Sequence, residues 1–151
     1  DERIMFYGRG VVETVKKLRW DPTLIHCSGW VSALAPIYLK KLYADDPAFK
    51  NAKIVYSVFD NGFEGNLDPR MVEKLEMEGF TKEDLATIAS NPVDCLALNK
   101  LAIDYSDAVA QASPEIDSKL LEYINQSGKP FLPYPGDTDF VEKYAKFYES
   151  L

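Results

Sequence analysis

Apolar residues recur along the chain with two alternating periods, and this alternation predicts a succession of helices and strands. Residues 4–18 show a helical spacing, and residues 30–43 repeat it with Pro36 inside, where we expect a kink or a shifted start. Two short β-branched runs, residues 23–27 and 53–59, have the length and composition of buried strands. This order of strand, helix and strand predicts a parallel α/β unit.

The second half of the chain continues the alternation. Residues 60–70 are rich in Gly, Asn and Asp and predict a loop at the carboxyl end of the second strand, the edge where ligands bind in open α/β sheets. Ser113 and Pro114 predict the start of a helix that continues to about Asn125, and Gly128 is placed to end it. The other expected elements are helices at 69–78, 81–88 and 92–105, strands at 108–112 and 131–134, and a last helix at 138–151 capped by Thr138.

These elements predict an α/β fold, a Rossmann-like open parallel sheet with helices on both faces, formed by residues 1–151 as a single domain. We expect the last helix to pack back on this domain and close it. The size and the 46% hydrophobic content are those of one globular domain. Because the sequence begins at Asp1 and not at Met, we expect it to be a fragment of a longer chain.

Charge and hydropathy limit the partners. The formal net charge of −7 disfavours nucleic acid, which is bound by clustered basic residues. No apolar run reaches the roughly 20 residues needed to cross a bilayer, so we expect no membrane partner. The sequence therefore predicts a soluble, cytoplasmic protein.

Few residues offer catalytic chemistry by themselves. Cys27 and Cys95 lie among apolar neighbours and predict free thiols in a reducing cytoplasm, with a disulfide or a shared metal as the less favoured alternative. His26, the sole histidine, ends an apolar strand and is more often structural than catalytic at such a position. It has no nearby ligand cluster, so we expect neither a metal nor a cofactor. Asp60 and Glu64 could act as paired carboxylates, although turn geometry and solubility are the commoner roles of acids in such a loop.

Four segments, in order and spacing, resemble the N-terminal domain of bacterial glycogen synthases and plant starch synthases, glycosyltransferases of the two-domain GT-B type. Residues 15–43 resemble the family's strand "VVHAHDWHT" and helix "GLVPAYLK", and residues 45–56 resemble "DPFFKNAKVVF". Residues 57–65 take the place of "TIHNLAYQG", and residues 101–116 resemble "GGIVYADRVTTVSPTYA". The resemblance covers about residues 3–116 and implies half of a GT-B fold.

Departures from the family pattern fall on positions that, in the family this chain resembles, carry polar groups toward the sugar. Of "HAHDWH" only His26 and Trp30 remain, and Phe59 and Asp60 replace the "HN" of "TIHNLAYQG", whereas Lys100 keeps the family's lysine. Loss of hydrogen-bonding side chains removes transition-state stabilisation, so the resemblance implies an eroded catalytic edge. The family's Lys-x-Gly-Gly donor motif and its C-terminal donor domain are absent from this sequence.

The resemblance implies a glycogen or starch synthase-like domain, the acceptor-side half of an ADP-glucose:α-1,4-glucan glucosyltransferase, inactive alone and with no catalytic residue assigned. Two alternatives remain: part of an active synthase whose donor domain lies outside this chain, and a non-catalytic domain that binds a protein partner. The implied ligand is an α-glucan or a nucleotide sugar. The expected ligand contacts, all placed at the carboxyl edge of the sheet, are His26, Trp30, Asp60, Asn61, Glu64 and Lys100.

Overall fold

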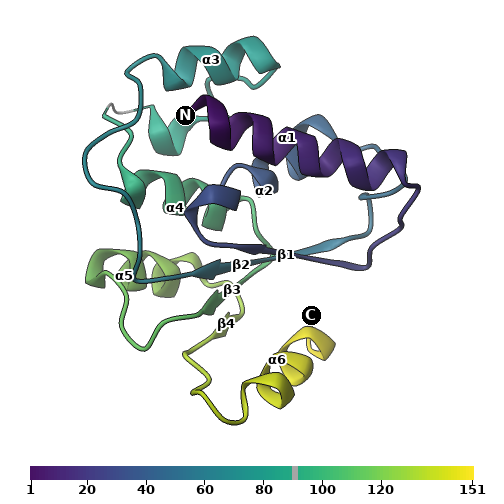
Figure 1. Cartoon of the computed structure of the whole chain (residues 1–151), viewed down its shortest axis with the longest axis vertical. Coiled ribbons are helices and arrows are strands. Elements are labelled where there is room, and N and C mark those ends of the chain that lie inside the picture. The colour runs from purple at the N-terminus through teal and green to yellow at the C-terminus, as the bar shows by residue number, and fades with distance from the viewer. Residues whose placement is uncertain (90–91) are drawn as a thin grey trace.

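The computed structural model describes residues 1–89 and 92–151, and its centre is a four-stranded parallel sheet (Figure 1). The strands lie in the order of the sequence: β1 (Leu24–Ser28), β2 (Lys53–Val58), β3 (Ala108–Gln111) and β4 (Phe131–Leu132). Right-handed crossovers between sequential parallel strands place the connecting helices on one face of the sheet. The opposite face is left for the C-terminal segment.

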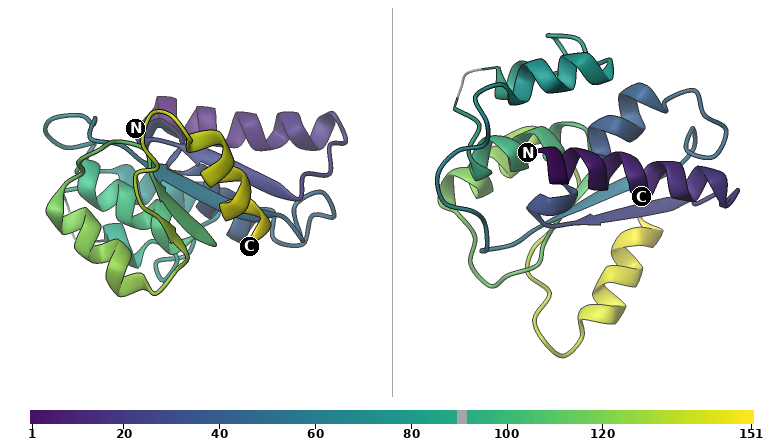
Figure 2. Two further views of the ribbon diagram at one scale, coloured as in Figure 1. Left: turned by 90° about the horizontal axis from the view of Figure 1, so that it is seen from below. Right: turned by 45° about the horizontal axis from the view of Figure 1, so that its top comes forward.

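The helices divide unequally between these two faces. All but the last contribute to one large layer, and the last helix lies alone on the other side (Figures 1 and 2). They are α1 (Glu2–Lys17), η1 (Trp30–Ser32), α2 (Ala35–Ile37), η2 (Tyr38–Leu42), α3 (Met71–Glu78), η3 (Ala86–Ile88), α4 (Cys95–Asp104), α5 (Ser118–Ser127) and α6 (Phe140–Glu149). The expected α/β sheet with helices on both faces is confirmed.

Strand β2 shows how the sheet separates two apolar clusters. Because side chains alternate along a strand, Ile54 and Tyr56 point into the large layer and Val55 points to the other face. Tyr56 is fully buried, and its hydroxyl donates to Asn99 Oδ1 at 2.7 Å, which satisfies the polar group inside the core. On the other face, Val55 packs with two alanines of β3 under α6.

The last helix packs on the domain, as expected. The apolar face of α6 covers Val55, Ala108 and Ala110. The residues of the C-terminal segment that pack there are Tyr144, Phe147, Tyr148 and Leu151. The helix begins at Phe140 after Asp139, and the expected cap at Thr138 is wrong.

Some expected elements differ from those observed in the large layer. Strand β1 was expected to be buried, but it is an edge strand and only Cys27 of its five residues is buried. Residues 30–43 form three short helical pieces in place of one helix, with Pro36 in the first turn of α2, where its fixed φ is tolerated. At residues 81–88, Thr81 and Asp84 form the reciprocal capping bonds, but only turns and η3 follow them.

The start of α5 also differs from the expectation. Asp117 caps this helix, and its carboxylate accepts the N–H groups of Lys119 at 2.8 Å and Leu120 at 3.1 Å. Ser113 is therefore not the cap. Gly128 ends the helix in the left-handed conformation, as expected.

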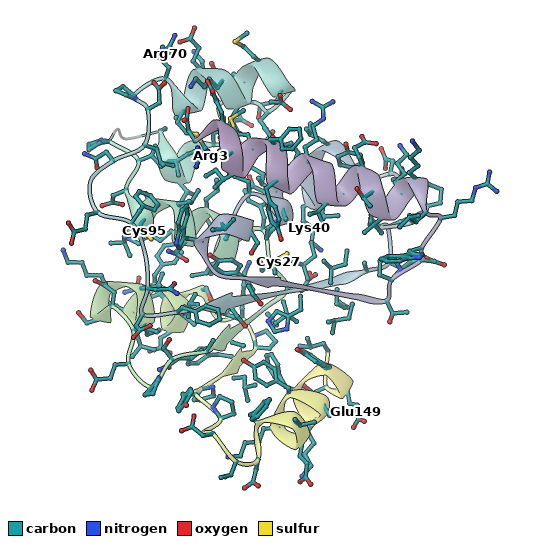
Figure 3. All side chains as sticks on the ribbon, viewed as in Figure 1. Arg3, Cys27, Lys40, Arg70, Cys95 and Glu149 are labelled. Carbon is teal, nitrogen blue, oxygen red and sulfur yellow. The ribbon has the colours of Figure 1, made fainter. Side chains whose placement is uncertain are left out.

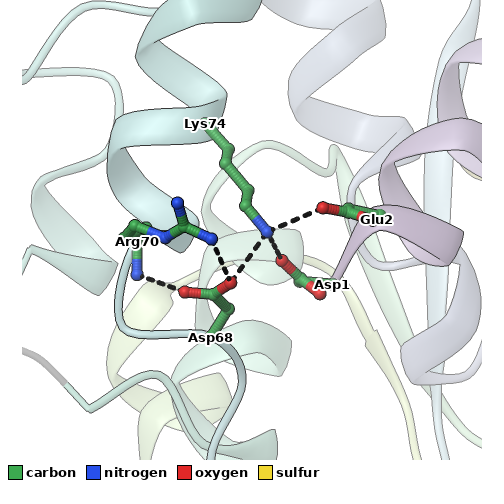
Figure 4. A network of polar contacts seen from close by, with 5 residues as sticks. All are labelled: Asp1, Glu2, Asp68, Arg70 and Lys74. Carbon is green, nitrogen blue, oxygen red and sulfur yellow. Dashed lines mark hydrogen bonds and ion pairs between the residues drawn. The ribbon is translucent and has the colours of Figure 1, made fainter.

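A network of charges joins the start of α1 to α3 (Figure 4). Lys74 donates to Asp1, to Glu2 Oε1 at 3.0 Å and to Asp68 Oδ2 at 2.9 Å. Asp68 also accepts the backbone N–H of Arg70 at 2.8 Å. These bonds, first that from Lys74, hold the pKa of the Asp68 carboxyl below its usual range, so the network fixes α3 beside the first turn of α1.

Cys27 lies between the sheet and the large helical layer, Cys95 begins α4, and both thiols are free (Figure 3). Within residues 1–89 and 92–151, no helix has the length and apolar character to cross a membrane.

Candidate functional site

The loops after β1 and β2 meet at the carboxyl edge of the sheet. Gly29 follows β1 with φ of 71°, a conformation that favours glycine, and its N–H donates to the Ser57 carbonyl at 3.0 Å. This turn directs the chain into η1, where Trp30 lies with its ring centroid 5.0 Å from that of Phe63. The aromatic pair joins the two loops and leaves both rings partly exposed.

The loop after β3 is tied to the same edge through Asp60. The backbone N–H of Asp60 donates to Ser113 Oγ at 3.1 Å, and this hydroxyl donates to the Asp60 carboxylate at 3.0 Å. Gln111, the last residue of β3, fixes this loop, because its Nε2 donates to the carbonyls of Ser113 at 2.8 Å and Pro114 at 3.0 Å. Ser113 thus connects two loops, which is the reason why it does not cap a helix.

Four of the six predicted contact residues lie on these adjoining loops. Trp30 follows β1, and Asp60, Asn61 and Glu64 belong to the loop after β2, where all three acidic or amide side chains are exposed. Exposed oxygens beside an aromatic surface can accept hydrogen bonds from a hydroxylated ligand while the ring contacts its apolar face. Whether these residues bind a ligand stays a prediction.

His26 lies away from these loops, which corrects its expected position. Its side chain points from β1 toward α6, where Nδ1 contacts Tyr148 Oη at 2.5 Å and Nε2 contacts Ser57 Oγ at 2.5 Å. Burial under α6 lowers the pKa of the imidazole. The His26 ring therefore contacts the C-terminal helix and β2, and it takes no part in the aromatic pair that joins the loops after β1 and β2.

Lys100 also lies elsewhere. It occupies the middle of α4, and its Nζ stands 5.0 Å from the ring centroid of Tyr123 on α5. Because α4 runs back from the carboxyl edge toward the start of β3, a residue five positions after Cys95 has left that edge. In the structure Lys100 contacts α5 and not the loops after β1 and β2, and its role as a ligand contact stays a prediction.

Ser113 and Tyr148 make contacts with predicted site residues that the sequence did not indicate. Ser113 carries a Ser-Pro signal that is typical of helix starts, and its bonds to Asp60 come from a segment 53 positions away. Tyr148 contacts His26 across 122 positions, and no local pattern could indicate that pairing. In the described parts of the chain, no three His, Cys, Asp or Glu side chains gather in a way that could hold a metal ion.

The amino-acid sequence is similar to those of known proteins. Residues 1–128 match the family model described as the starch synthase catalytic domain. A glycogen synthase of Clostridium perfringens is 33% identical over 112 residues, which are 74% of this chain and 23% of that protein. A glycogen synthase of Chlorobaculum parvum is 33% identical over 122 residues, covering 75% of this chain and 22% of the relative. The chain thus spans less than a quarter of the length of these relatives.

A solved structure has a similar fold. The catalytic domain of starch synthase IV from Arabidopsis thaliana, bound to ADP and acarbose, superposes with a TM-score of 0.67 at 19% sequence identity. The match covers 87% of this chain and 28% of that one.

Proposed function

Because this chain belongs to the family of starch synthase catalytic domains, we propose that it is an acceptor-side part of a glycogen or starch synthase that binds α-glucan and transfers no glucose alone. The site of binding is the carboxyl edge of β1 and β2. The plant neighbour of the same fold was solved with ADP and acarbose, which supports a glucan as the ligand of this chain and a nucleotide sugar as the ligand of a complete synthase.

The observation that carries the proposal is the aromatic pair at that edge. Trp30 and Phe63 meet at 64° and remain partly exposed, next to the exposed side chains of Asp60, Asn61 and Glu64. An aromatic face with acceptor groups around it suits a glucan, which presents apolar ring faces and hydroxyl donors.

The composition of the edge supports binding without catalysis. In the family resemblance a histidine stands at the position of Phe59 and an aspartate at the position of Gly29. Transition-state stabilisation needs placed polar groups, and a phenyl ring supplies none. The alternative is an active synthase whose donor domain lies outside this chain. That domain would then have to supply the polar contacts to the sugar that this edge lacks.

We place the protein in a reducing cytoplasm, which its two free thiols support. Burial raises the pKa of the Cys27 thiol to about 12, so this cysteine stays protonated and unreactive at neutral pH.

Calorimetric titration of the chain with maltoheptaose, and separately with ADP-glucose, tests the proposal. We expect heat of binding with maltoheptaose only, a loss of affinity of about tenfold in Trp30→Ala, and smaller loss in Trp30→Phe, which keeps an aromatic face. The matched control is Trp20→Ala, because Trp20 is exposed in the turn before β1 and should not contact the glucan.

Circular dichroism of each variant separates lost binding from lost folding, since Trp30 also packs against the large core. Absence of heat with maltoheptaose, or equal losses in Trp30→Ala and Trp20→Ala, would contradict glucan binding at this edge. Binding of ADP-glucose by the chain alone would favour the active-synthase alternative.

A further inference from the structure

Ser113 makes two hydrogen bonds with Asp60 at the carboxyl edge of the sheet. Its hydroxyl accepts the backbone N–H of Asp60 at 3.1 Å and donates to Asp60 Oδ1 at 3.0 Å. Without such bonds, an exposed aspartate side chain exchanges among several staggered orientations. One hydroxyl therefore fixes both the main chain and the carboxylate of Asp60.

The position of Ser113 is set by the end of β3. Ser113 is buried, and its carbonyl accepts Nε2 of Gln111, the last residue of β3, at 2.8 Å. The N–H of Ala112 donates to the Val58 carbonyl at 2.8 Å, which continues the bonding of the sheet to this point. Pro114 restricts the backbone of the residue before it. The Ser113 hydroxyl thus belongs to the rigid end of the sheet, whereas Asp60 begins an exposed loop.

The two carboxylate oxygens of Asp60 differ in their surroundings. Oδ1 accepts the Ser113 hydroxyl, and Oδ2 has no hydrogen-bond or ion-pair partner among residues 1–89 and 92–151. A carboxylate oxygen is an acceptor, and the hydroxyl groups of a glucan are donors. A side chain that is already ordered loses less conformational entropy when a ligand binds to it. The bond to Oδ1 therefore prepares Oδ2 to accept a sugar hydroxyl.

We propose that Ser113 is a positioning residue for the glucan: it orients Asp60 for a hydrogen bond to a sugar hydroxyl and does not contact the ligand itself. This inference rests on the proposed function, because it concerns a residue of the same binding edge. Gln111, Ser113 and Asp60 all lie within residues 1–128, the part that matches the family of starch synthase catalytic domains. The arrangement is therefore independent of the C-terminal segment that contains α6.

A double-mutant cycle, measured by calorimetric titration with maltoheptaose, tests the proposal. We expect Ser113→Ala to weaken binding about fivefold, because Asp60 must then be ordered by the ligand. Asp60→Ala should weaken binding about tenfold, and the double variant should bind no more weakly than Asp60→Ala, because Ser113 acts only through Asp60. Ser113→Thr keeps the hydroxyl and should bind like the unmodified chain.

Amide hydrogen exchange, followed by NMR, measures the positioning without a ligand. The N–H of Asp60 should exchange about fivefold faster in Ser113→Ala and at its original rate in Ser113→Thr. The matched control is Ser106→Ala, since Ser106 is also buried and its hydroxyl donates to the Ala102 carbonyl at 2.7 Å, before the start of β3. This variant should lower the melting temperature but leave glucan affinity and the exchange of Asp60 unchanged.

The possible failures separate this inference from the proposed function. If the unmodified chain binds maltoheptaose and Ser113→Ala binds it equally well, only the role of Ser113 is refuted. The same conclusion follows if the losses in the double variant multiply, or if Ser106→Ala weakens binding as much as Ser113→Ala does. If the unmodified chain gives no heat of binding, glucan binding at this edge is refuted, and the role of Ser113 with it.

Discussion

At the scale of single residues, His26 is held on both ring nitrogens. Tyr148 Oη and Ser57 Oγ each lie 2.5 Å from one nitrogen, and a hydroxyl can donate or accept. The neutral ring, with one donor and one acceptor nitrogen, is therefore satisfied in either tautomer. Tyr144 and Tyr148 pack around the ring at centroid distances of 5.8 and 5.7 Å, and this burial penalises the charged form.

This environment predicts a loss of stability in mild acid. The pKa of His26 is lowered in the folded state, whereas it is about 6.5 in the unfolded chain, so the unfolded state binds more protons below that pH. Stability should be complete above about pH 6.5 and should fall as the pH drops toward the folded-state pKa. Urea denaturation at about pH 7.5 and pH 5.5 measures the difference.

The control for this prediction is His26→Gln, in which the dependence on pH over that interval should largely disappear. Because His26 is the only histidine, its ring protons are the only imidazole signals in the proton NMR spectrum. A titration midpoint at or above about pH 6.5 would contradict the prediction.

At the scale of elements, α6 has no buried residue of its own but covers the second apolar cluster. Truncation after Gly136 should expose Val55, Ala108 and Ala110 and free His26 from Tyr148, so we expect a lower melting temperature and binding of a hydrophobic dye. Phe147→Ala, which keeps the helix, should cost about 2 kcal/mol, less than a fully buried ring. An unchanged melting temperature in the truncated chain would contradict the role of α6 as a cover.

Val141→Ala provides the matched control for that prediction. Val141 is also on α6 but is 65% exposed, so the truncation of its side chain should change stability by less than about 0.5 kcal/mol. Thermal unfolding of the three variants under one condition makes the comparison.

Elements with strong local signals could be predicted from the sequence, and those decided by distant contacts could not. The β-branched run of β2 and the glycine that ends α5 were found because strand composition and a left-handed C-cap are local properties. The exposure of β1 depends on which strands lie beside it. Ser113 has the local pattern of a helix cap, but its bonds with Asp60 prevail.

At the scale of the whole molecule, part of the candidate site could be predicted from the sequence, because some of its residues follow an element with a strong local signal. The loop after β2 follows a strand that the sequence identifies, so Asp60, Asn61 and Glu64 could be placed at the sheet edge. The direction of a side chain across a sheet or around a helix depends on three-dimensional packing. His26 points under α6 and Lys100 toward α5, and neither direction has a local signal.

The whole chain corresponds to a minor part of its relatives, and this predicts its behaviour in a transfer assay. It spans 23% of the Clostridium perfringens glycogen synthase and 28% of the plant structure. Glucosyl transfer requires donor and acceptor to be held in reacting geometry, and correct positioning can supply several kcal/mol of the barrier. Under the proposed function this chain binds the acceptor alone, and the donor is then not held in reacting geometry.

We therefore expect no elongation of maltoheptaose when this chain is incubated with ADP-glucose, as measured by chromatography of the products. Phe59→His should not restore transfer, because a polar group at the edge does not position a nucleotide sugar. The same variant can still change glucan affinity, so calorimetry shows whether the edge has been altered. Elongation by the unmodified chain would contradict this prediction and would mean that the edge of β1 and β2 holds both substrates without a second domain.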